Sequence, residues 1–213
     1  MNPAIANLRR EYRLLTLNEN EVAPDPLQQF SLWWNEAIKS EIDEVNAMTL
    51  ATATPTGMPS ARIVLLKGFD ENGFVFFTNY NSEKGKEIAA NPNVALLFFW
   101  KELERQVRME GRIEKISAAD SDAYFKSRPF GSRIGAWTSP QSEVIEGRDQ
   151  LEMKYAELEK QFSSGEIARP AHWGGYTVKP VSYEFWQGRS SRLHDRIRYY
   201  LGNNTWKIER LAP

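Results

Sequence analysis

A run of short β-type segments separated by turn residues most limits how this chain can fold. Between residues 47 and 80 the apolar residues recur with a period of two, and the turn sequences TPTG and DENG interrupt them, which predicts a meander of three strands. Strands joined by such short turns pair antiparallel, so we predict a mainly β fold with helices (α+β), built on a closed or nearly closed antiparallel barrel. Further strands are predicted at 94–100, 105–116, 174–180, 182–188, 186–196 and 206–211.

Helices are predicted between these strands by capping residues and by helical periodicity. Asp25 and Pro26 form an N-cap and N1 pair that opens a helix through residue 42, with an apolar stripe that includes Phe30, Trp33, Trp34 and Ile38. The continuous apolar run 94–100 predicts a strand buried on both faces. The other predicted helices are 3–15, 83–90 after Ser82, 118–128 after Ser117, and the amphipathic segment 147–162, whereas 131–142 is predicted to be a loop.

Length and composition narrow the class of protein. A chain of 213 residues can bury a hydrophobic core large enough to fold without covalent cross-links. Because the chain has no Cys, disulfides and thiolate metal sites are excluded. Two His make a His-rich metal site improbable, so we expect no metal. Charged residues follow the N-terminus at once and no apolar run reaches a membrane span, so we expect a cytoplasmic protein with no membrane partner. The net charge of −1 gives no reason to expect a nucleic-acid partner, so anion recognition must be local.

The stretch WQGRSSRLHDR, residues 186–196, concentrates positive charge beside an aromatic ring. In a strand, Arg192, His194 and Arg196 would share one face, whereas a helix would place Arg192 over Arg196 as a repulsive pair. We therefore predict a strand whose basic face meets an anion or an electron-rich ring. A solvated basic edge strand is an equally weighted alternative.

A second candidate site combines donors near the end of a predicted helix. Tyr124 and Arg128 are neighbours at i,i+4, and Ser132 follows in a Gly-containing turn. A hydroxyl, a guanidinium fork and a second hydroxyl suit a phosphate group. Taken alone, a packed Tyr beside a solvated Arg is the better interpretation of this segment.

Three weaker signals remain. Lys84 lies in the first turn of a short helix, which is favourable only if an anion binds there. Arg62 and Lys67 bracket four apolar residues, which alone indicates a core strand with charged ends. The polar segment 138–142 has no local cue to a partner, and His172 beside an aromatic residue favours a structural role. Because no nucleophile–base–orienter trio stands out, we expect a cofactor to carry any chemistry.

Taken together, these segments resemble the pyridoxine/pyridoxamine 5′-phosphate oxidase family. The similarity lies in LRREY, SARIVLLKGFDENGFVFFTN, NPNVALLFFW, YFKSRP, SRIGAW, WGGY, EFWQG-x-x-x-RLHDR and WKIERLAP, in collinear order from about residue 8 to the end. The resemblance implies a single FMN-binding split-barrel domain over 1–213. In it, an N-terminal helical segment 1–45 and a C-terminal strand pair 182–213 would complete the active site of a homodimer.

The activity that the resemblance implies is FMN-dependent oxidation of pyridoxine or pyridoxamine 5′-phosphate to pyridoxal 5′-phosphate, a vitamin B6 reaction. Hydride would pass from substrate C4′ to flavin N5, and O₂ would be reduced to H₂O₂. Arg192 and His194 would be catalytic. The residues implied for FMN are Arg62, Ile63, Val64, Leu65, Leu66, Lys67, Phe77, Thr78, Lys84, Gln106, Gln141, Ser142, Trp186 and Arg196. Those implied for substrate are Arg9, Tyr12, Lys67, Tyr124, Arg128, Ser132, Arg192, Leu193 and His194.

Two positions depart from the family pattern. Glu83 stands where the family often has a basic residue, so one contact to the FMN phosphate is expected to be missing, and Phe77 stands where a Tyr is expected. A non-catalytic split-barrel carrier of FMN or pyridoxal phosphate is the alternative function; it would keep the phosphate donors and lose the pair Arg192 and His194. A barrel that binds RNA would need a broader basic surface.

Overall fold

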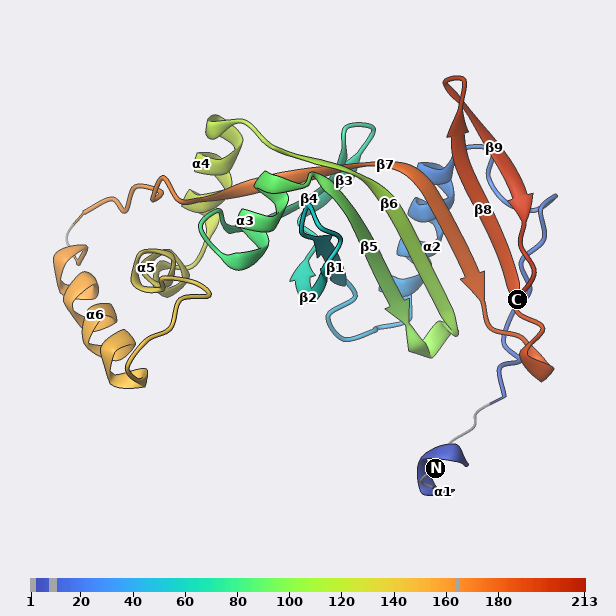
Figure 1. Cartoon of the computed structure of the whole chain (residues 1–213), viewed down its shortest axis with the longest axis horizontal. Helices are drawn as coiled ribbons and strands as arrows, with labels where there is room; N and C mark the ends of the chain where they lie inside the picture. The colour runs from blue at the N-terminus through green and yellow to red at the C-terminus, as the bar shows by residue number, and fades with distance from the viewer. Residues whose placement is uncertain (1–2, 8–10, 164) are drawn as a thin grey trace. The chain divides into compact units, whose positions relative to one another are not determined.

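The computed structural model describes residues 3–7, 11–163 and 165–213 of the chain (Figure 1). The helices are α1 (Pro3–Ala6), α2 (Pro26–Lys39), α3 (Glu83–Ala90), α4 (Ala118–Ser127), α5 (Phe130–Thr138) and α6 (Arg148–Gln161), with single 3₁₀ turns η1 (Lys101–Leu103) and η2 (Ser190–Arg192). The strands are β1 (Ala47–Ala53), β2 (Pro59–Leu65), β3 (Gly68–Asp70), β4 (Gly73–Asn79), β5 (Asn93–Trp100), β6 (Arg105–Lys115), β7 (Trp173–Gln187), β8 (Asp195–Gly202) and β9 (Thr205–Arg210).

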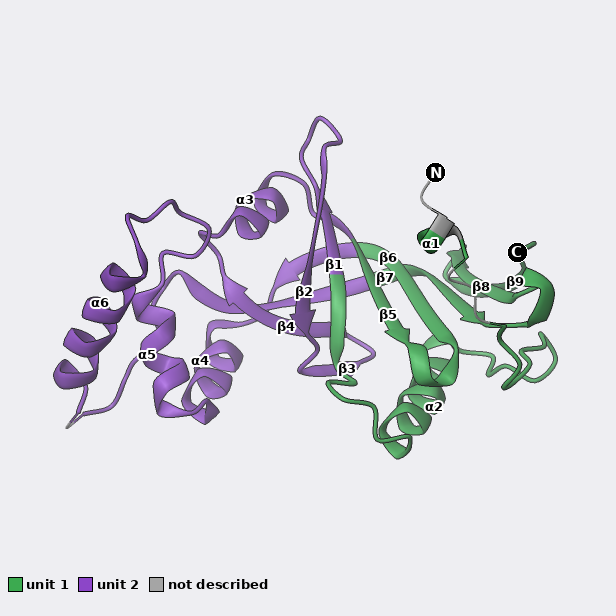
Figure 2. Ribbon diagram, turned by 90° about the horizontal axis from the view of Figure 1, so that it is seen from below, with its two compact units in different colours: residues 1–49, 95–111, 180–213 green, residues 50–94, 112–179 purple. Residues whose placement is uncertain are grey.

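Within the described residues, the strands are hydrogen bonded in the order β2-β1-β5-β6-β7-β4-β3, with β8 paired to β7 and β9 to β8. The pairs β3/β4, β4/β7, β7/β8 and β8/β9 are antiparallel, as predicted. The chain divides into two compact units, coloured separately in Figure 2. Unit 1 comprises residues 1–49, 95–111 and 180–213, and unit 2 comprises residues 50–94 and 112–179.

Unit 1 is organised by the aromatic face of α2. The helix begins as predicted, because the Asp25 carboxylate accepts hydrogen bonds from the backbone N–H groups of Leu27 and Gln28 and Pro26 occupies the first helical position. Phe30 and Trp33 are buried, with ring centroids 5.3 Å from Phe98 and 5.2 Å from Phe185 respectively. Ile38, expected on the same stripe, is half exposed, and Ala37 is buried instead.

Unit 2 joins a strand pair to a group of helices. Strand β4 pairs with β3 on one side and with the first half of β7 on the other, so that Phe77 lies opposite Gly175 and Thr78 opposite Gly174. Helices α4, α5 and α6 bury one apolar cluster made of Phe125, Ile134, Leu158, Ile167 and Trp173. This cluster links the start of β7 to the helices that follow β6.

Several predicted elements differ from the structure. The segment 131–142, predicted to be a loop, contains most of α5. The fully buried Ile134 packs in the helical cluster and offsets the cost of about 1 kcal/mol for each helical glycine. The predicted meander of three strands is wrong, because residues 47–79 form four strands and β2 and β3 stand at opposite ends of the hydrogen-bonded order. The strands predicted at 174–180 and 182–188 are one continuous strand. Strand β5 alternates in burial, with Phe99 half exposed, so it is not buried on both faces. Among the described residues of 3–15, only Pro3–Ala6 is helical.

None of the helices in the described part of the chain is long and apolar enough to cross a membrane.

Candidate functional site

Unit 2 contains a cavity of about 490 Å³ between β2, β4, α3 and α4. Strand β2 and the residues after it supply one wall, β4 supplies Phe77 and Thr78, and the end of α4 supplies Tyr124 and Arg128. The cavity is lined by Ile63, Val64, Leu65, Lys67, Phe77, Thr78, Asn79, Lys84, Tyr124, Arg128, Pro129, Ser132, Gln141 and Trp173. Eleven of these fourteen residues are ones that the sequence predicts for FMN or for the substrate.

The guanidinium of Arg128 is stacked on aromatic rings and lacks an acceptor. Its Cζ atom lies 4.5 Å from the ring centroid of Trp173 and 5.7 Å from that of Phe125. Its Nη1 atom is buried and has no hydrogen-bond partner in the described part of the chain. Burial lowers the pKa of Arg128 from its ordinary value. A buried guanidinium donor without an acceptor is stabilised when an anion binds to it, so this arrangement of Arg128 would suit an anion.

Aromatic rings form a stacked wall beside this guanidinium. The ring centroids of Phe77 and Tyr124 are 3.8 Å apart, and the planes of Tyr124 and Trp173 differ by only 5°. The start of β7 therefore fixes both Tyr124 and Arg128 through Trp173. Pro129 ends α4 after Ser127 as predicted, and Ser132 in α5 reaches the same cavity.

Lys84 brings a second cation to the cavity from the first turn of α3. The Ser82 hydroxyl caps this helix by accepting a hydrogen bond from the Gly85 N–H, as predicted. The Lys84 Nζ donates to Gln141 Oε1 at 2.9 Å, and Thr78 Oγ1 donates to the same oxygen at 3.2 Å. Burial, and then the nearby charge of Arg62, lower the pKa of Lys84. These three side chains form a polar cluster at a helix N-terminus, which suits a phosphate group.

Arg62 does not line the cavity, although the sequence places it with the FMN residues. Its guanidinium donates to Glu87 Oε2 at 3.1 Å and also to the Thr52 hydroxyl. Glu87 on α3 further accepts hydrogen bonds from Thr52 and from Ser60, 2.7 Å away. Burial alone would raise the pKa of Glu87, but these hydrogen bonds and the charge of Arg62 outweigh it, so the pKa lies below its ordinary value. The network joins α3 to β1 and β2, the strand whose residues 63–65 line the cavity.

A second group of predicted residues lies in unit 1. The rings of Trp186 and His194 have centroids 4.6 Å apart, and Tyr12 packs edge-on at 5.7 Å from Trp186 and 6.0 Å from His194. The predicted strand through 186–196 is wrong, because β7 ends at Gln187 and β8 begins only at Asp195. Between them, Ser191 and Arg192 adopt positive φ values of 55° and 62°, which end any period of two. Arg192 and Leu193 are exposed on this turn.

In Arg196, each of the three guanidinium nitrogens already donates a hydrogen bond. Its Nε and Nη2 atoms donate to the two carboxylate oxygens of Glu184 at 2.8 and 3.1 Å, and Nη1 donates to the Ala212 carbonyl at 2.8 Å. The hydrogen bonds to Glu184, which are its largest influence, raise the pKa of Arg196. Gln106, in β6 of the same unit, is half buried.

The remaining predicted site residues are placed as follows. Leu66 is buried, and Ser142 is exposed with a φ of 74°. Arg9 lies outside the described residues. Sequence reasoning did not single out Trp173 or Glu87, although the aromatic residue in WGGY was a usable signal for the first. Nothing in the sequence identified Glu87, because its partners lie 25 to 35 positions away.

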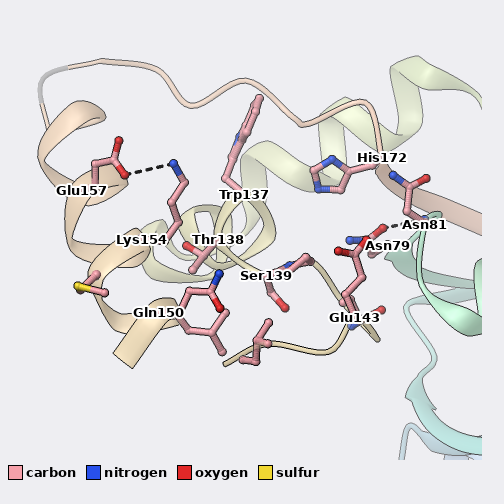
Figure 3. A pocket seen from close by; sticks show the side chains of 15 residues that line it. Asn79, Asn81, Trp137, Thr138, Ser139, Glu143, Gln150, Lys154, Glu157 and His172 are labelled. Atoms are coloured by element: carbon pink, nitrogen blue, oxygen red, sulfur yellow. Dashed lines mark hydrogen bonds and ion pairs between the residues drawn. The ribbon is translucent and has the colours of Figure 1, made fainter. Parts of the chain in front are cut away.

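A larger cavity of about 550 Å³ adjoins the first one in unit 2, since both are lined by Asn79 and Gln141, and it lies between α6 and the segment 137–145 (Figure 3). Trp137, Glu143, Lys154 and His172 are among the residues around it. His172 Nε2 donates to the Ala136 carbonyl at 3.0 Å, an interaction that fits the predicted structural role of this residue. Within the described residues no group of three or more His, Asp or Glu side chains could hold a metal ion.

Comparison with protein families matches two parts of the chain. Residues 34–162 match the model described as "Pyridoxamine 5'-phosphate oxidase". Residues 173–213 match "Pyridoxine 5'-phosphate oxidase C-terminal dimerisation region". The first match covers β1 to α6 and every residue that lines the cavity of about 490 Å³ except Trp173, and the second covers β7, which begins with Trp173, and also β8 and β9.

Full-length relatives agree with these matches. The chain is 58% identical to a pyridoxine/pyridoxamine 5′-phosphate oxidase of a Nostoc species over 100% of both proteins. It is also 58% identical to one from Cupriavidus pinatubonensis, over 98% of this chain and 99% of the relative. The chain therefore belongs to the pyridoxine/pyridoxamine 5′-phosphate oxidase family, and it is an enzyme, as the sequence predicts.

Solved structures show the same fold. PhzG from Burkholderia lata, in complex with tetrahydrophenazine-1-carboxylic acid, has a TM-score of 0.89 and 28% identity over 96% of this chain and 100% of its own. A pyridoxamine 5′-phosphate oxidase-related, FMN-binding protein of Nostoc punctiforme has a TM-score of 0.70 and 19% identity, over 90% of this chain and 100% of its own. The predicted fold class, an α+β antiparallel split barrel, is confirmed.

Replacing Arg128 by Met should separate stability from anion binding. Without phosphate, we expect a free energy of unfolding equal to or above that of the wild type, because the variant buries no unpaired guanidinium. Inorganic phosphate should raise the unfolding temperature of the wild type, since a ligand at 100 times its Kd adds about 2.7 kcal/mol. The rise should be smaller in Arg128→Met, which keeps only the cluster of Lys84, Thr78 and Gln141. The control is Lys126→Met on the same helix, because Lys126 is exposed and pairs with Glu166. Equal phosphate dependence in wild type and Arg128→Met would exclude Arg128 from the anion site.

Replacing Glu87 by Gln should destabilise the fold in a pH-dependent way. The low pKa of Glu87 means that its contribution is fully present above about pH 4.5 and is lost as the pH falls through the folded-state pKa. We expect a loss on the order of 3 kcal/mol at pH 7 in denaturant unfolding, because the change leaves Arg62 without its anion, and a smaller loss below pH 4.5. Glu114→Gln, which breaks an exposed pair with Lys179, should cost less than about 1 kcal/mol. A constant difference at all pH values would contradict this account.

Proposed function

We propose that the protein binds FMN and oxidises pyridoxine 5′-phosphate or pyridoxamine 5′-phosphate to pyridoxal 5′-phosphate, with O₂ reduced to H₂O₂. Oxidation of the amine would also consume water and release ammonia. The observation that carries the proposal is the cavity of unit 2, where Arg128 has a buried free donor and Lys84 lies at a helix N-terminus. Lys67 also lines this cavity, so three cationic side chains are available for two phosphorylated molecules. The full-length similarity to relatives named for this activity supports the same reaction.

The donors of the cavity fit the phosphate and the ring of FMN. Lys84, Thr78 and Gln141 would hold the cofactor phosphate at the start of α3, while the backbone and side chains of β2 and its end would lie along the flavin. Arg62 would act on this site through its charge and through α3, because its guanidinium is engaged by Glu87. The full proposed set is Arg62, Ile63, Val64, Leu65, Leu66, Lys67, Phe77, Thr78, Lys84, Gln106, Gln141, Ser142, Trp186 and Arg196.

The substrate phosphate would be held by Lys67, Tyr124, Arg128 and Ser132. All four line the cavity, and they offer a cation, a phenol, a guanidinium and a hydroxyl to a dianion. Fixing the phosphate at one end restricts the substrate ring to a narrow range of positions over the cofactor. Much of the rate enhancement would come from this positioning.

The C-terminal part of the chain would complete the cavity across a homodimer interface. Trp186, Arg192, Leu193, His194 and Arg196 all lie within the matched dimerisation region 173–213, so we propose that they face the cavity of the partner subunit. Tyr12 packs on Trp186 and His194 in the same group, and we propose that Tyr12 and Arg9 bind the substrate there. In this arrangement the N-terminal segment and the strand pair 182–213 complete a single FMN-binding domain in each subunit.

Bound FMN would supply the two-electron acceptor. Its N5 would take the hydride from substrate C4′, and O₂ would reoxidise the reduced flavin. The residues of the chain would bind the flavin and the substrate and orient them toward each other. Arg192 is exposed on its turn and presents a planar guanidinium that can stack on the pyridine ring. Arg196 adds positive charge where reduction builds negative charge, although its pairing with Glu184 moderates this effect.

The absorption spectrum of the purified protein tests this proposal. We expect flavin bands that bleach when pyridoxine 5′-phosphate is added without oxygen and that return when air is admitted. Arg192→Ala should keep the bands, because it does not line the cavity of unit 2, and should bleach at least about tenfold more slowly. A protein that binds FMN but never bleaches would be a carrier, and a protein without flavin bands after FMN is added would contradict the proposal.

A further inference from the structure

The imidazole of His194 has one nitrogen committed to the backbone. The N–H of Arg189 donates a hydrogen bond to His194 Nδ1 over 3.1 Å. A backbone N–H can only donate, so Nδ1 must present its lone pair and carry no proton. A neutral imidazole has one N–H, which leaves the proton on Nε2. The geometry therefore fixes the tautomer of His194.

The turn between β7 and β8 is built to make this contact. Ser191 and Arg192 both have positive φ values, a backbone conformation that is strained for residues other than glycine. The turn is closed by a hydrogen bond from the Leu193 N–H to the Ser190 carbonyl at 3.1 Å. Arg189 is itself held, because its Nη1 donates to Asp195 Oδ2 at 3.2 Å. The strained turn brings a backbone donor to a ring five residues further along the chain.

The surroundings of His194 also favour the neutral ring. Burial lowers the pKa of His194, the charge of Arg192 lowers it further, and Asp195 opposes these effects. Two rings, Trp186 and Tyr12, pack against the imidazole. The negative charge of Asp195 is not available to the imidazole alone, because its oxygens also accept hydrogen bonds from Arg189, Arg210 and the Leu17 N–H. An imidazolium would have to give up the Arg189 contact.

We propose that His194 acts in the reaction as a neutral hydrogen-bond donor through Nε2–H, and that it does not accept the proton that the substrate loses. Its partner would be an electron-rich oxygen or nitrogen on the pyridine ring or on C4′ of the bound substrate. The turn 189–192 would be the positioning device that selects this tautomer. The inference rests on the proposed function, because it assigns the role of one residue within that site.

Nuclear magnetic resonance of the imidazole nitrogens tests the tautomer in the wild-type holoenzyme. The chain has only two His, so ¹⁵N-His labelling gives four ring signals, and the signals of His194 are those missing from His194→Gln. At pH 7 we expect a pyridine-type Nδ1 and a pyrrole-type Nε2 for His194. His172, whose Nε2 donates to the Ala136 carbonyl, provides an internal reference for the same tautomer. A protonated Nδ1, whether in the other tautomer or in an imidazolium, would overturn the inference.

Two substitutions test the role of the donor in turnover. The amide nitrogen of Gln can reach the place of Nε2, whereas the shorter Asn places its amide near Nδ1 and has nothing at Nε2. We expect His194→Gln to keep kcat within about tenfold of the wild type, as for a changed hydrogen bond. His194→Asn should lose on the order of a hundredfold, as for the removal of one transition-state hydrogen-bond donor. FMN absorbance in each variant shows whether the site is intact.

The outcomes separate this inference from the proposed function. If both variants lose kcat equally, by the roughly 10²–10⁴-fold typical of a missing general base, His194 is the proton acceptor and the inference fails. If both keep full kcat, the Nε2 donor is not used and the inference also fails. In either case, flavin bands in the wild type that bleach with pyridoxine 5′-phosphate would leave the proposed function standing.

Discussion

A guanidinium stacked on an indole, with a buried N–H group that has no acceptor, is the interaction on which the site depends. Arg128 lies over Trp173 because Trp173 begins β7 and also packs in the cluster of α4, α5 and α6. The same indole orders Tyr124 and Phe77 into a stacked wall. The fold therefore holds a desolvated positive charge open toward the cavity, and such a charge is stabilised when an anion binds. A phosphorylated ligand meets this requirement.

A second constraint is the crowding of cations near α3. Arg62 and Lys84 are close enough that the charge of Arg62 lowers the pKa of Lys84. Glu87, which is itself in α3, reduces this repulsion because its carboxylate binds Arg62, whereas Lys84 extends to Gln141. The acidic residue at position 83 is exposed at the start of the helix, where the helix dipole favours it, so it is compatible with the fold. The proposed anion site at this helix therefore depends on Lys84 and on the hydrogen bonds that Glu87 accepts.

The sequence predicted what local signals determine. The caps Asp25, Ser82 and Ser117 and the stop at Pro129 are where the structure has them, because each acts on its own neighbours. Two failures came from non-local causes. The buried contacts of Ile134 turned a Gly-rich loop into α5, and the backbone of Ser191 and Arg192 broke an apparent strand. Periodicity placed His194 on a basic face but could not show that its Nδ1 is bound to Arg189.

The central claim is that each active site combines unit 2 of one subunit with the dimerisation region of its partner. Mixing unfolded Arg128→Met and Arg192→Ala subunits in equal amounts and refolding them tests it at low substrate concentration. Random pairing would put one intact site in half of the dimers, so we predict recovery to about a quarter of the wild-type activity. Arg128→Met mixed with Lys67→Met, both in unit 2, should recover nothing. No recovery in the first mixture, from subunits shown to exchange, would contradict the account.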